Sequence, residues 1–352
     1  MAENYHEDVK NQNIQKLRDK LKELPRFVGE YFRGIDNTKS SRTKLVYAGD
    51  IKIFFDFLIN ETLIFTGKSM KDLVVSDLDG VSISDIEEFA EYLSYYTKRA
   101  GNTEQEFTNE EHGKARKLAA VRTMFKYFYK KEQITKNPAD FVESPKIHEK
   151  AITKLETDEV AKLLDAVESG EFLLKNEKAR HANNCERDLA IITLLLGTGM
   201  RVSECVGINL EHLDFDRNAV KVTRKGGNES VLYFSREVSD ALKNYIEKRK
   251  KLQPLAGHEH ALFISQKRMR ITCRAVENLL EKYTRNTITT KHITPHKLRS
   301  TFGTHLYRES GDIYLVADVL GHRDVNTTRK HYADVGESRR REAVKYVKLR
   351  EN

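Results

Sequence analysis

Near its C-terminal end the chain reads LGHRDVNTTRKHY from Leu320 to Tyr332. The Leu-Gly step predicts the end of a helix, because glycine readily adopts the left-handed conformation that ends many helices. His322 follows this bend directly, and the residues after it predict a short helix that carries Tyr332. The stretch therefore places an imidazole and a phenol on one structured segment.

A second polar segment, His296-Lys-Leu-Arg299, lies shortly before it. His296 and Arg299 are one helical turn apart, and Leu298, Phe302 and Leu306 form the apolar face of the same predicted helix. Two polar head groups are thus held on one side of an anchored helix.

Further towards the N-terminus, the sequence predicts an antiparallel hairpin. Ala219–Thr223 and Ser230–Phe234 flank a polar turn, Gly226-Gly227-Asn228. Arg224 and Lys225 lie at the tip of this hairpin. Cations at such a tip are usually only solvated, so this segment is weak evidence by itself.

A fourth segment reads GTGMRVSE from Gly197 to Glu204 and follows Leu189–Leu196, which predicts a buried helix. Arg201 comes after the glycine turn, and Glu204 can share its helix face and fix its guanidinium. Taken alone, an Arg–Glu pair of this kind is more often a structural ion pair.

Together and in this order, the four segments have one chemical interpretation. Displacing an alkoxide from a phosphodiester requires a nucleophile, donors for the charge on the non-bridging oxygens, and an acid for the leaving 5′ oxygen. Two arginines, two histidines, a lysine and a tyrosine supply all three, so we expect no metal and no other cofactor. A phenol, with an ordinary pKa of about 10, becomes a competent nucleophile only where neighbouring cations stabilise its anion.

The first part of the chain has a different pattern. Residues 1–24 are charged, with a helix as one possibility, and they have too little apolar surface to form a domain, so they predict a mobile extension. Residues 25–143 predict a helical domain. Ser84 and Glu87 match a capping box that opens one of its helices. Two further helices are marked by apolar stripes at helical spacing. The first stripe consists of Leu45, Ala48, Ile51, Phe55 and Leu58, and the second, within Lys114–Lys131, consists of Leu118, Val121, Phe125 and Phe128. The cations of the last helix project mostly away from its stripe, as on a solvated face: Lys114, Arg116, Lys117 and Arg122.

Residues 144–152 contain Ser144-Pro145 and a polar run, and they predict a linker. The domain that follows, residues 153–335, is expected to be mostly α-helical with one small antiparallel sheet. Its first helix starts at Thr157, and the polar segment Glu168–Glu186 is expected to be a loop. Four further helices are predicted over Ser235–Leu252, Ile271–Arg285, Thr294–Ser310 and Asp312–Leu320.

Composition narrows the class of protein. The 352 residues carry a formal net charge of +8, which favours a polyanionic partner such as nucleic acid. The three cysteines are widely spaced and indicate neither a disulfide framework nor a thiolate zinc site. No apolar run approaches the roughly 20 residues needed to cross a bilayer, so we expect a soluble, cytoplasmic protein with no membrane partner.

With these motifs in place, the chain resembles the tyrosine recombinases, or phage integrases, over about residues 25–350. The family order is an arginine in a glycine-turn segment, a lysine on a hairpin, a His-x-x-Arg box, a Leu-Gly-His box and a tyrosine. In this chain the positions are filled by Arg201, Lys225, His296 with Arg299, His322 and Tyr332. No position is empty, which argues against a relative that does not cleave DNA.

The resemblance implies a role for each of these residues. Arg201 and Arg299 would hold the scissile phosphate, assisted by His296 and His322. Glu204 would support the first arginine.

Lys225 would protonate the leaving 5′ hydroxyl, and Tyr332 would form the 3′-phosphotyrosyl bond. Arg224 and Lys221 remain alternatives to Lys225, because a slip of the strand register would change which side chain faces the DNA.

The resemblance also implies a layout and partners. Residues 25–143 would be a SAM-like core-binding domain, 153–335 an integrase-type catalytic domain, and 336–352 a tail helix that contacts a neighbouring protomer. The partners would be a double-stranded DNA recombination site and further copies of the chain in a homotetramer on DNA, with a monomer as one alternative in solution. The implied DNA-binding residues are Lys114, Arg116, Lys117, Arg122 and Arg224.

Two other functions stay open. A type IB topoisomerase would use similar chemistry, although the two-domain layout and the Leu-Gly-His box favour recombination. A DNA-binding regulator would keep the fold without the chemistry. Within recombination, the sequence does not distinguish integration, excision, transposition and chromosome-dimer resolution.

Overall fold

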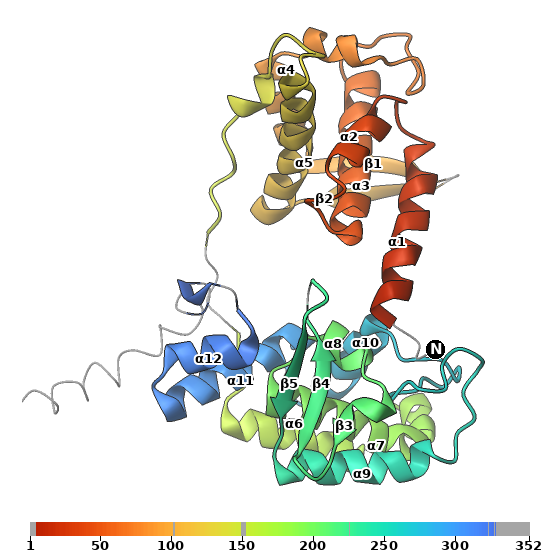
Figure 1. Cartoon of the computed structure of the whole chain (residues 1–352), viewed down its shortest axis with the longest axis vertical. Coiled ribbons are helices and arrows are strands. Elements are labelled where there is room, and N and C mark those ends of the chain that lie inside the picture. The colour runs from red at the N-terminus through yellow and green to blue at the C-terminus, as the bar shows by residue number, and fades with distance from the viewer. Residues whose placement is uncertain are drawn as a thin grey trace, which may run out of the picture. The chain divides into compact units, whose positions relative to one another are not determined.

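The structure is a computed structural model, and it describes residues 5–100, 103–148, 153–224, 226–322, 324–326 and 328. Its contacts divide the chain into two compact units (Figure 1). The N-terminal unit spans Glu7–Lys150, and the C-terminal unit spans Ala151–Asn352 together with Met1–His6. Among the described residues, no helix has the length and apolar character needed to span a membrane.

The N-terminal unit is a helical domain with one added hairpin. Its elements are α1 (Tyr5–Leu21), α2 (Val28–Gly34), α3 (Ser41–Asn60), η1 (Val75–Gly80), α4 (Ile83–Tyr92), β1 (Tyr95–Ala100), β2 (Thr103–Thr108), α5 (Glu111–Lys130) and η2 (Pro138–Asp140). The two longest helices of the unit, α3 and α5, pack against each other around an aromatic-rich core. The two predicted apolar stripes lie on these helices and are confirmed: all their members but Leu45 are buried, and Leu45 packs against the same core.

The start of the chain differs from the prediction of a mobile extension. Tyr5–Leu21 form α1, and Leu17 and Leu24 are buried in the core of the N-terminal unit. Leu17, Leu21 and Leu24 recur at helical spacing, which gives this charged segment a narrow apolar side that can pack.

The cap of α4 also differs from the prediction. The helix begins at Ile83, and its N-cap is Ser82 instead of Ser84. The Ser82 hydroxyl accepts from the backbone N–H of Asp85, and the Asp85 carboxylate accepts from the Ser82 N–H at 2.6 Å. Asp85 thus completes the capping box in place of Glu87.

The hairpin β1–β2 is a feature that we did not predict. It is antiparallel, with Tyr95 opposite Thr108 and Tyr96 opposite Phe107. The rings of Tyr92, Tyr96 and Phe107 stack in series at 5.3 and 5.4 Å between centroids. This aromatic stack joins the base of the hairpin to α4.

The C-terminal unit is mostly helical and holds one small antiparallel sheet, as the sequence predicted; besides the predicted hairpin, the sheet contains a third, short strand. Its elements are α6 (Thr157–Ser169), α7 (Lys175–Thr198), α8 (Val202–Val206), η3 (Leu210–His212), β3 (Leu213–Asp214), β4 (Ala219–Thr223), β5 (Glu229–Tyr233), α9 (Arg236–Arg249), α10 (Cys273–Thr284), α11 (Pro295–Ser310) and α12 (Ile313–Leu320). The strand order is β3-β4-β5, and the predicted hairpin has the register Ala219 opposite Tyr233.

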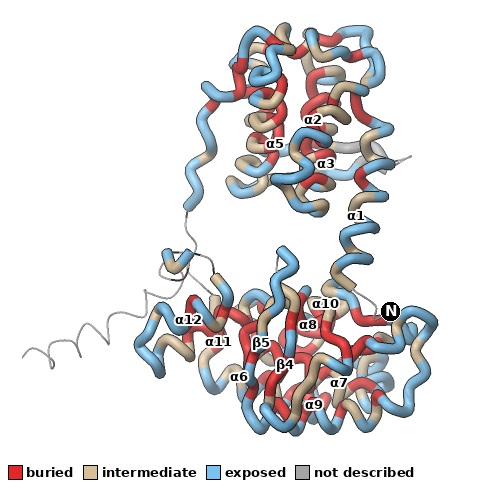
Figure 2. The backbone as a smooth tube through the Cα atoms, viewed as in Figure 1, coloured by how far each residue is buried: buried red, intermediate tan, exposed pale blue. Residues whose placement is uncertain are grey.

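Helix α7 forms the centre of this unit. It packs against α6, α9 and α11, and its second half is buried (Figure 2). The prediction of a loop over Glu168–Glu186 is wrong, because α7 begins at Lys175. Most of the polar residues at the start of α7 face solvent, and the lysine, glutamate, alanine and arginine residues among them favour a helix, so they extend the buried helix outwards instead of ending it.

The cap of α4 provides a test of the fold. Ser82→Ala removes the N-cap acceptor and should lower the free energy of unfolding by about 1 kcal/mol. Ser84→Ala is the matched control, because Ser84 is an exposed residue inside the first turn and its loss should change stability by less than about 0.3 kcal/mol. Urea unfolding of both variants measures the difference, and equal effects would contradict the assigned cap.

Candidate active site

The glycine turn after α7 positions the first arginine. Gly199 ends α7 with φ of +62°. A Cβ at this position would lie 2.4 Å from Cδ1 of Phe302 and 2.9 Å from Cδ2 of Leu320. Both the backbone conformation and the close packing therefore require glycine here. The turn brings Arg201 to the N-cap position of α8.

Arg201 is held by Glu204, as the sequence predicted. The Arg201 backbone N–H donates to Oε2 of Glu204 at 2.9 Å, and its Nη1 donates to Oε1 at 2.8 Å. The Glu204 side chain is 1% exposed, whereas that of Arg201 is 33% exposed. A buried carboxylate thus fixes one edge of a guanidinium whose remainder reaches the surface.

Arg299 lies deeper in the unit than Arg201. It is 3% exposed on α11. Its Nη1 donates to the carbonyl of Gly199 at 2.7 Å, and its Nη2 donates to the carbonyl of Leu320 at 2.5 Å. Arg299 therefore joins three elements: the end of α7, the helix α11 and the end of α12.

Arg224 binds the same end of α12. Its Nη1 donates to the carbonyl of Leu320 at 2.7 Å, and its Nη2 donates to that of Val319 at 3.0 Å. Burial lowers the pKa of the Arg224 guanidinium, against the opposing effect of Glu204. We expected Arg224 to project from the hairpin tip towards DNA. The structure instead turns it back to α12, because the carbonyls at a helix C-terminus carry partial negative charge.

The Leu320 carbonyl is therefore shared by two guanidinium groups, and this shared acceptor brings the predicted motifs together. Arg299 belongs to the His-x-x-Arg box, Arg224 belongs to the hairpin, and Leu320 opens the Leu-Gly-His box. The carbonyl of Gly199, from the fourth motif, accepts from the same Arg299 guanidinium. Four segments that are far apart in sequence thus meet at one point.

His322 follows this point directly. Its backbone N–H donates to the carbonyl of Ala317 at 2.9 Å, which places it just beyond α12. Its Nδ1 is 2.7 Å from the hydroxyl of Thr328, a residue with 0% exposure. Thr328 orients the imidazole in this way. It is not among the residues that the sequence predicted, because a threonine in a polar run carries no pattern.

The remaining predicted site residues are only partly placed. His296 is exposed in the first turn of α11, on the helix that carries Arg299. Lys225 and Tyr332 lie outside the described residues, as does the predicted tail helix at 336–352. Lys221, the alternative to Lys225, pairs with Glu229 across β4 and β5 at 2.8 Å.

The cations of α5 have partners inside the N-terminal unit. Lys117 is buried and donates to the side chain of Asn109, so it is not on a DNA-facing surface as we expected. Arg122 donates to the carbonyls of Ala139 and Val142, which fixes the segment after α5. The guanidinium of Arg122 is thus used within the domain.

The other two α5 cations remain at the surface. Arg116 pairs with the buried Asp50, and its side chain is 42% exposed. Lys114 donates to the hydroxyl of Ser94 at 2.5 Å in an exposed contact.

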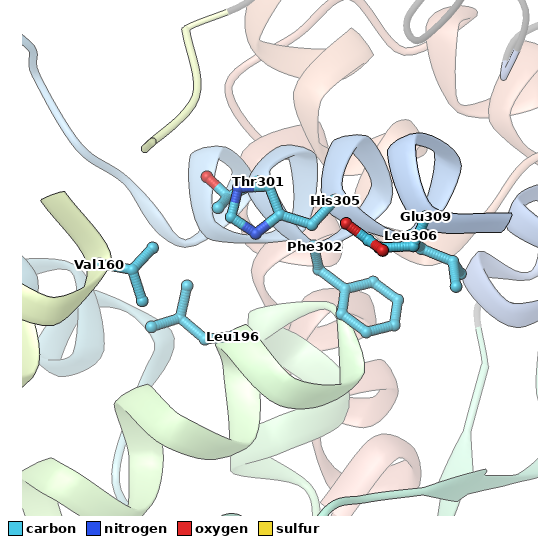
Figure 3. Close-up of a pocket in the computed structure, with 7 residues that line it drawn as sticks. All are labelled: Val160, Leu196, Thr301, Phe302, His305, Leu306 and Glu309. Carbon is cyan, nitrogen blue, oxygen red and sulfur yellow. The ribbon is translucent and has the colours of Figure 1, made fainter. Parts of the chain in front are cut away.

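A pocket of about 250 Å³ lies beside α11 (Figure 3). Val160 of α6 and Leu196 of α7 face the part of α11 that carries its other lining residues: Thr301, Phe302, His305, Leu306 and Glu309. Nε2 of His305 is buried with no hydrogen-bond partner among the described residues, and burial lowers the pKa of His305. The wall is therefore mainly apolar, with one imidazole nitrogen that lacks a partner.

Among the described residues, no group of three His, Cys, Asp or Glu side chains could hold a metal ion. The guanidiniums of Arg224 and Arg299 share the Leu320 carbonyl, and the guanidinium of Arg201 and the carboxylate of Glu204 lie within electrostatic reach of Arg224. Their arrangement fits an anionic ligand.

Comparison with known proteins gives consistent matches. Residues 153–339 match the model of the phage integrase family. Tyrosine recombinase XerC of Caldanaerobacter subterraneus subsp. tengcongensis is 33% identical over 325 residues, which cover 89% of this chain and 83% of the relative. Tyrosine recombinase XerS of Streptococcus thermophilus is 29% identical and covers 90% of this chain and 93% of the relative.

Among solved structures, XerH site-specific recombinase bound to palindromic difH substrate, a post-cleavage complex, has the same fold. Its TM-score is 0.63 at 19% identity, over 95% of each chain. The family model covers more than half of the chain, and the XerC relative is similar along most of its length. The chain therefore belongs to the phage integrase family and is a tyrosine recombinase.

Proposed function

We propose that this protein is a site-specific DNA recombinase that cleaves and rejoins strands through a 3′-phosphotyrosyl intermediate, exchanging strands between two sites in a tetramer. The observation that carries the proposal is the meeting of four motifs around Arg299 and the Leu320 carbonyl. Its substrate is DNA, so we place the protein in the cytoplasm.

Arg201 is the best-supported phosphate ligand of the site. Glu204 fixes one edge of its guanidinium while a third of the side chain stays exposed. A donor that is held in place before the substrate arrives needs no reorganisation as charge develops on the phosphate oxygens. Losing one donor of this kind costs about 3 kcal/mol, or roughly a hundredfold in rate.

Arg299 supports the site in a second way. Its terminal nitrogens bind the carbonyls of Gly199 and Leu320, so the position of its guanidinium is fixed before a substrate arrives. Its buried positive charge also raises the local potential. His322, oriented through Nδ1 by Thr328, and the exposed His296 are the proposed additional donors.

Tyr332 is the proposed nucleophile. Attack of its phenolic oxygen on phosphorus would form the phosphotyrosyl bond and break the bond to the 5′ oxygen, which leaves with a proton from Lys225. Because the aryl ester conserves the energy of the phosphodiester, the reverse attack by a 5′ hydroxyl rejoins the strand without ATP.

Lys225 is preferred as the acid over its neighbours. Arg224 is bound to the end of α12, and Lys221 is paired with Glu229. A guanidinium is also a poor acid, since its pKa exceeds about 12.

Relaxation of supercoils by a type IB topoisomerase would use the same chemistry as this recombinase. An assay for DNA products that join two sites distinguishes the two activities, because only a recombinase forms them.

DNA binding by the N-terminal unit is proposed to use exposed cations. Lys114 and Arg116 on α5 keep exposed side chains, whereas Lys117 and Arg122 act inside the domain. Phosphate contacts release counterions, so the affinity for DNA should fall steeply as the salt concentration rises.

The tail helix is proposed to dock on a neighbouring protomer at the pocket beside α11. In the sequence, Ala343, Val344 and Val347 would share one helix face. The pocket wall of Val160, Leu196, Phe302 and Leu306 is of matching apolar chemistry. Docking of each tail helix on the next protomer would link the protomers of a tetramer.

The nucleophile is tested with a nicked suicide substrate, from which the 5′ product diffuses away. The parent protein should accumulate a covalent complex with DNA. Tyr332→Phe removes only the hydroxyl, so it should form no covalent complex and should bind the same DNA with an affinity within about twofold. Denaturing gels and band shifts measure the two quantities, and a parent protein that traps no DNA would favour the non-enzymatic regulator.

The role of Lys225 as the general acid is tested by changing the leaving group of the DNA substrate. Lys225→Ala should slow cleavage of normal DNA by about a hundredfold. A substrate with sulfur in place of the 5′ bridging oxygen should restore the rate, because a thiolate, with a thiol pKa of about 8.5, leaves without protonation. Lys221→Ala and Arg224→Ala are the controls, and rescue of either of them in place of Lys225→Ala would reassign the acid.

The proposed docking of the tail helix is tested by measuring how cooperatively the protein binds two DNA half-sites. Removal of residues 339–352 should preserve binding to a single half-site and weaken cooperative binding to two half-sites by about tenfold or more. Val160→Trp should fill the pocket and produce the same loss in the full chain, while adding nothing to the truncated one. Additive effects of the two changes would contradict docking of the tail at this pocket.

A further inference from the structure

Helix α8 carries Arg201 at its start, but it has only five residues. A helix this short is not stable without contacts from other segments. Its C-terminal end is bound by Arg270, whose side chain is buried. Nη1 of Arg270 donates to the carbonyls of Val206 and Ile208 at 3.1 and 3.0 Å, and Nη2 donates to Oδ1 of Asn209 at 2.6 Å. Arg270 therefore caps the helix end that lies opposite Arg201.

Two residues from the start of the chain cover the same helix end. The guanidinium carbon of Arg270 is 5.3 Å from the centroid of the Tyr5 ring, and Tyr5 also packs against the apolar core of the C-terminal unit. A Cβ at Gly207 would lie 2.8 Å from Nε2 of His6 and 3.1 Å from Cδ1 of Tyr5. The first turn of α1 thus rests on the residue that follows α8.

The surroundings of His6 connect this contact to the active site. Burial lowers the pKa of His6, Glu204 opposes that shift, and Arg270 and His212 add to it. Glu204 is therefore within electrostatic reach of His6, and the same carboxylate fixes Arg201. Contacts lead without a gap from Tyr5 through Arg270 and α8 to Glu204 and Arg201.

We infer that Tyr5, His6 and Arg270 are positioning residues for strand cleavage: they hold α8 in place, and through Glu204 they set the guanidinium of Arg201. This inference rests on the proposed function, in which Arg201 binds the scissile phosphate. The N-terminal end of the chain belongs to the support of the active site, although α1 continues from His6 into the N-terminal unit.

Tyr5 gives a direct test with a matched control. Tyr5→Ala removes the ring from Arg270, and Tyr5→Phe keeps it. On a nicked suicide substrate at saturating protein, Tyr5→Ala should form the covalent complex about three- to tenfold more slowly, as expected for losing a cation–π contact of roughly 1 kcal/mol. Tyr5→Phe should stay within about twofold of the parent rate, and both variants should keep the parent affinity for DNA within about twofold.

Gly207 provides an independent test. Gly207→Ala places a methyl group where Tyr5 and His6 lie, and the backbone of Gly207 has a φ of −81°, which alanine also adopts. This variant should also slow cleavage in the parent background. In a chain that carries Tyr5→Ala and His6→Ala, the same substitution should add less than about twofold, because the contact is already lost. Gly80→Ala is the control, since nothing lies within 4 Å of its Cβ.

The outcomes separate this inference from the proposed function. A parent protein that traps no DNA overturns the proposed function itself. A parent that traps DNA, with Tyr5→Ala cleaving at the parent rate, overturns only the inference. Weaker DNA binding at an unchanged cleavage rate also overturns it, because Tyr5 would then act as a DNA contact or a tether. If Gly207→Ala slows cleavage as much in the chain with Tyr5→Ala and His6→Ala as in the parent, its methyl group acts on α8 itself, through the Ser203 carbonyl 3.2 Å away, and not through Tyr5 and His6.

Discussion

The carbonyl oxygen of Leu320 accepts from two guanidinium groups, Arg224 at 2.7 Å and Arg299 at 2.5 Å, and the rest of the site depends on this shared acceptor. Two cations would repel each other in a partly buried space. The C-terminal end of α12 offsets that repulsion, because its carbonyls carry partial negative charge. One helix end thus fixes the hairpin and α11 at a common point, and His322 follows that point in the chain.

In the proposed function, a site that gathers arginines in this way would be ready for a phosphate before any DNA arrives. Arg299 is buried, Arg224 is half-buried, and Arg201 is the guanidinium with the firmest carboxylate partner. The positive potential of the three favours the anionic form of a phenol brought near them, as well as the charge of the transition state. In the proposed function, the same arrangement would therefore serve both the nucleophile and the phosphate.

The sequence predicted these motifs well, because each has a local signal: a glycine bend, a hairpin turn or an apolar stripe. The prediction failed where the residues that make the decisive contact are far apart in the sequence. Arg224 looked like a DNA contact because nothing nearby in sequence shows that α12 would accept its donors. Lys117 looked solvated, since its burial against Asn109 depends on how the segment before α5 folds. The start of α7 looked like a loop, because polarity marks a solvent-facing helix and a loop alike.

The support of α8 shows the same limit most clearly. Glu204 is visible from the sequence because it is one helical turn from Arg201, whereas Arg270 is far along the chain and Tyr5 is near its first residue. A five-residue helix cannot hold a guanidinium in place by its own hydrogen bonds. Its start is closed by the carboxylate of its own Glu204, and its other end is fixed from outside by the guanidinium of Arg270. The precision of Arg201 is therefore a property of contacts drawn from three parts of the chain, and a change in any of them should be felt at the phosphate.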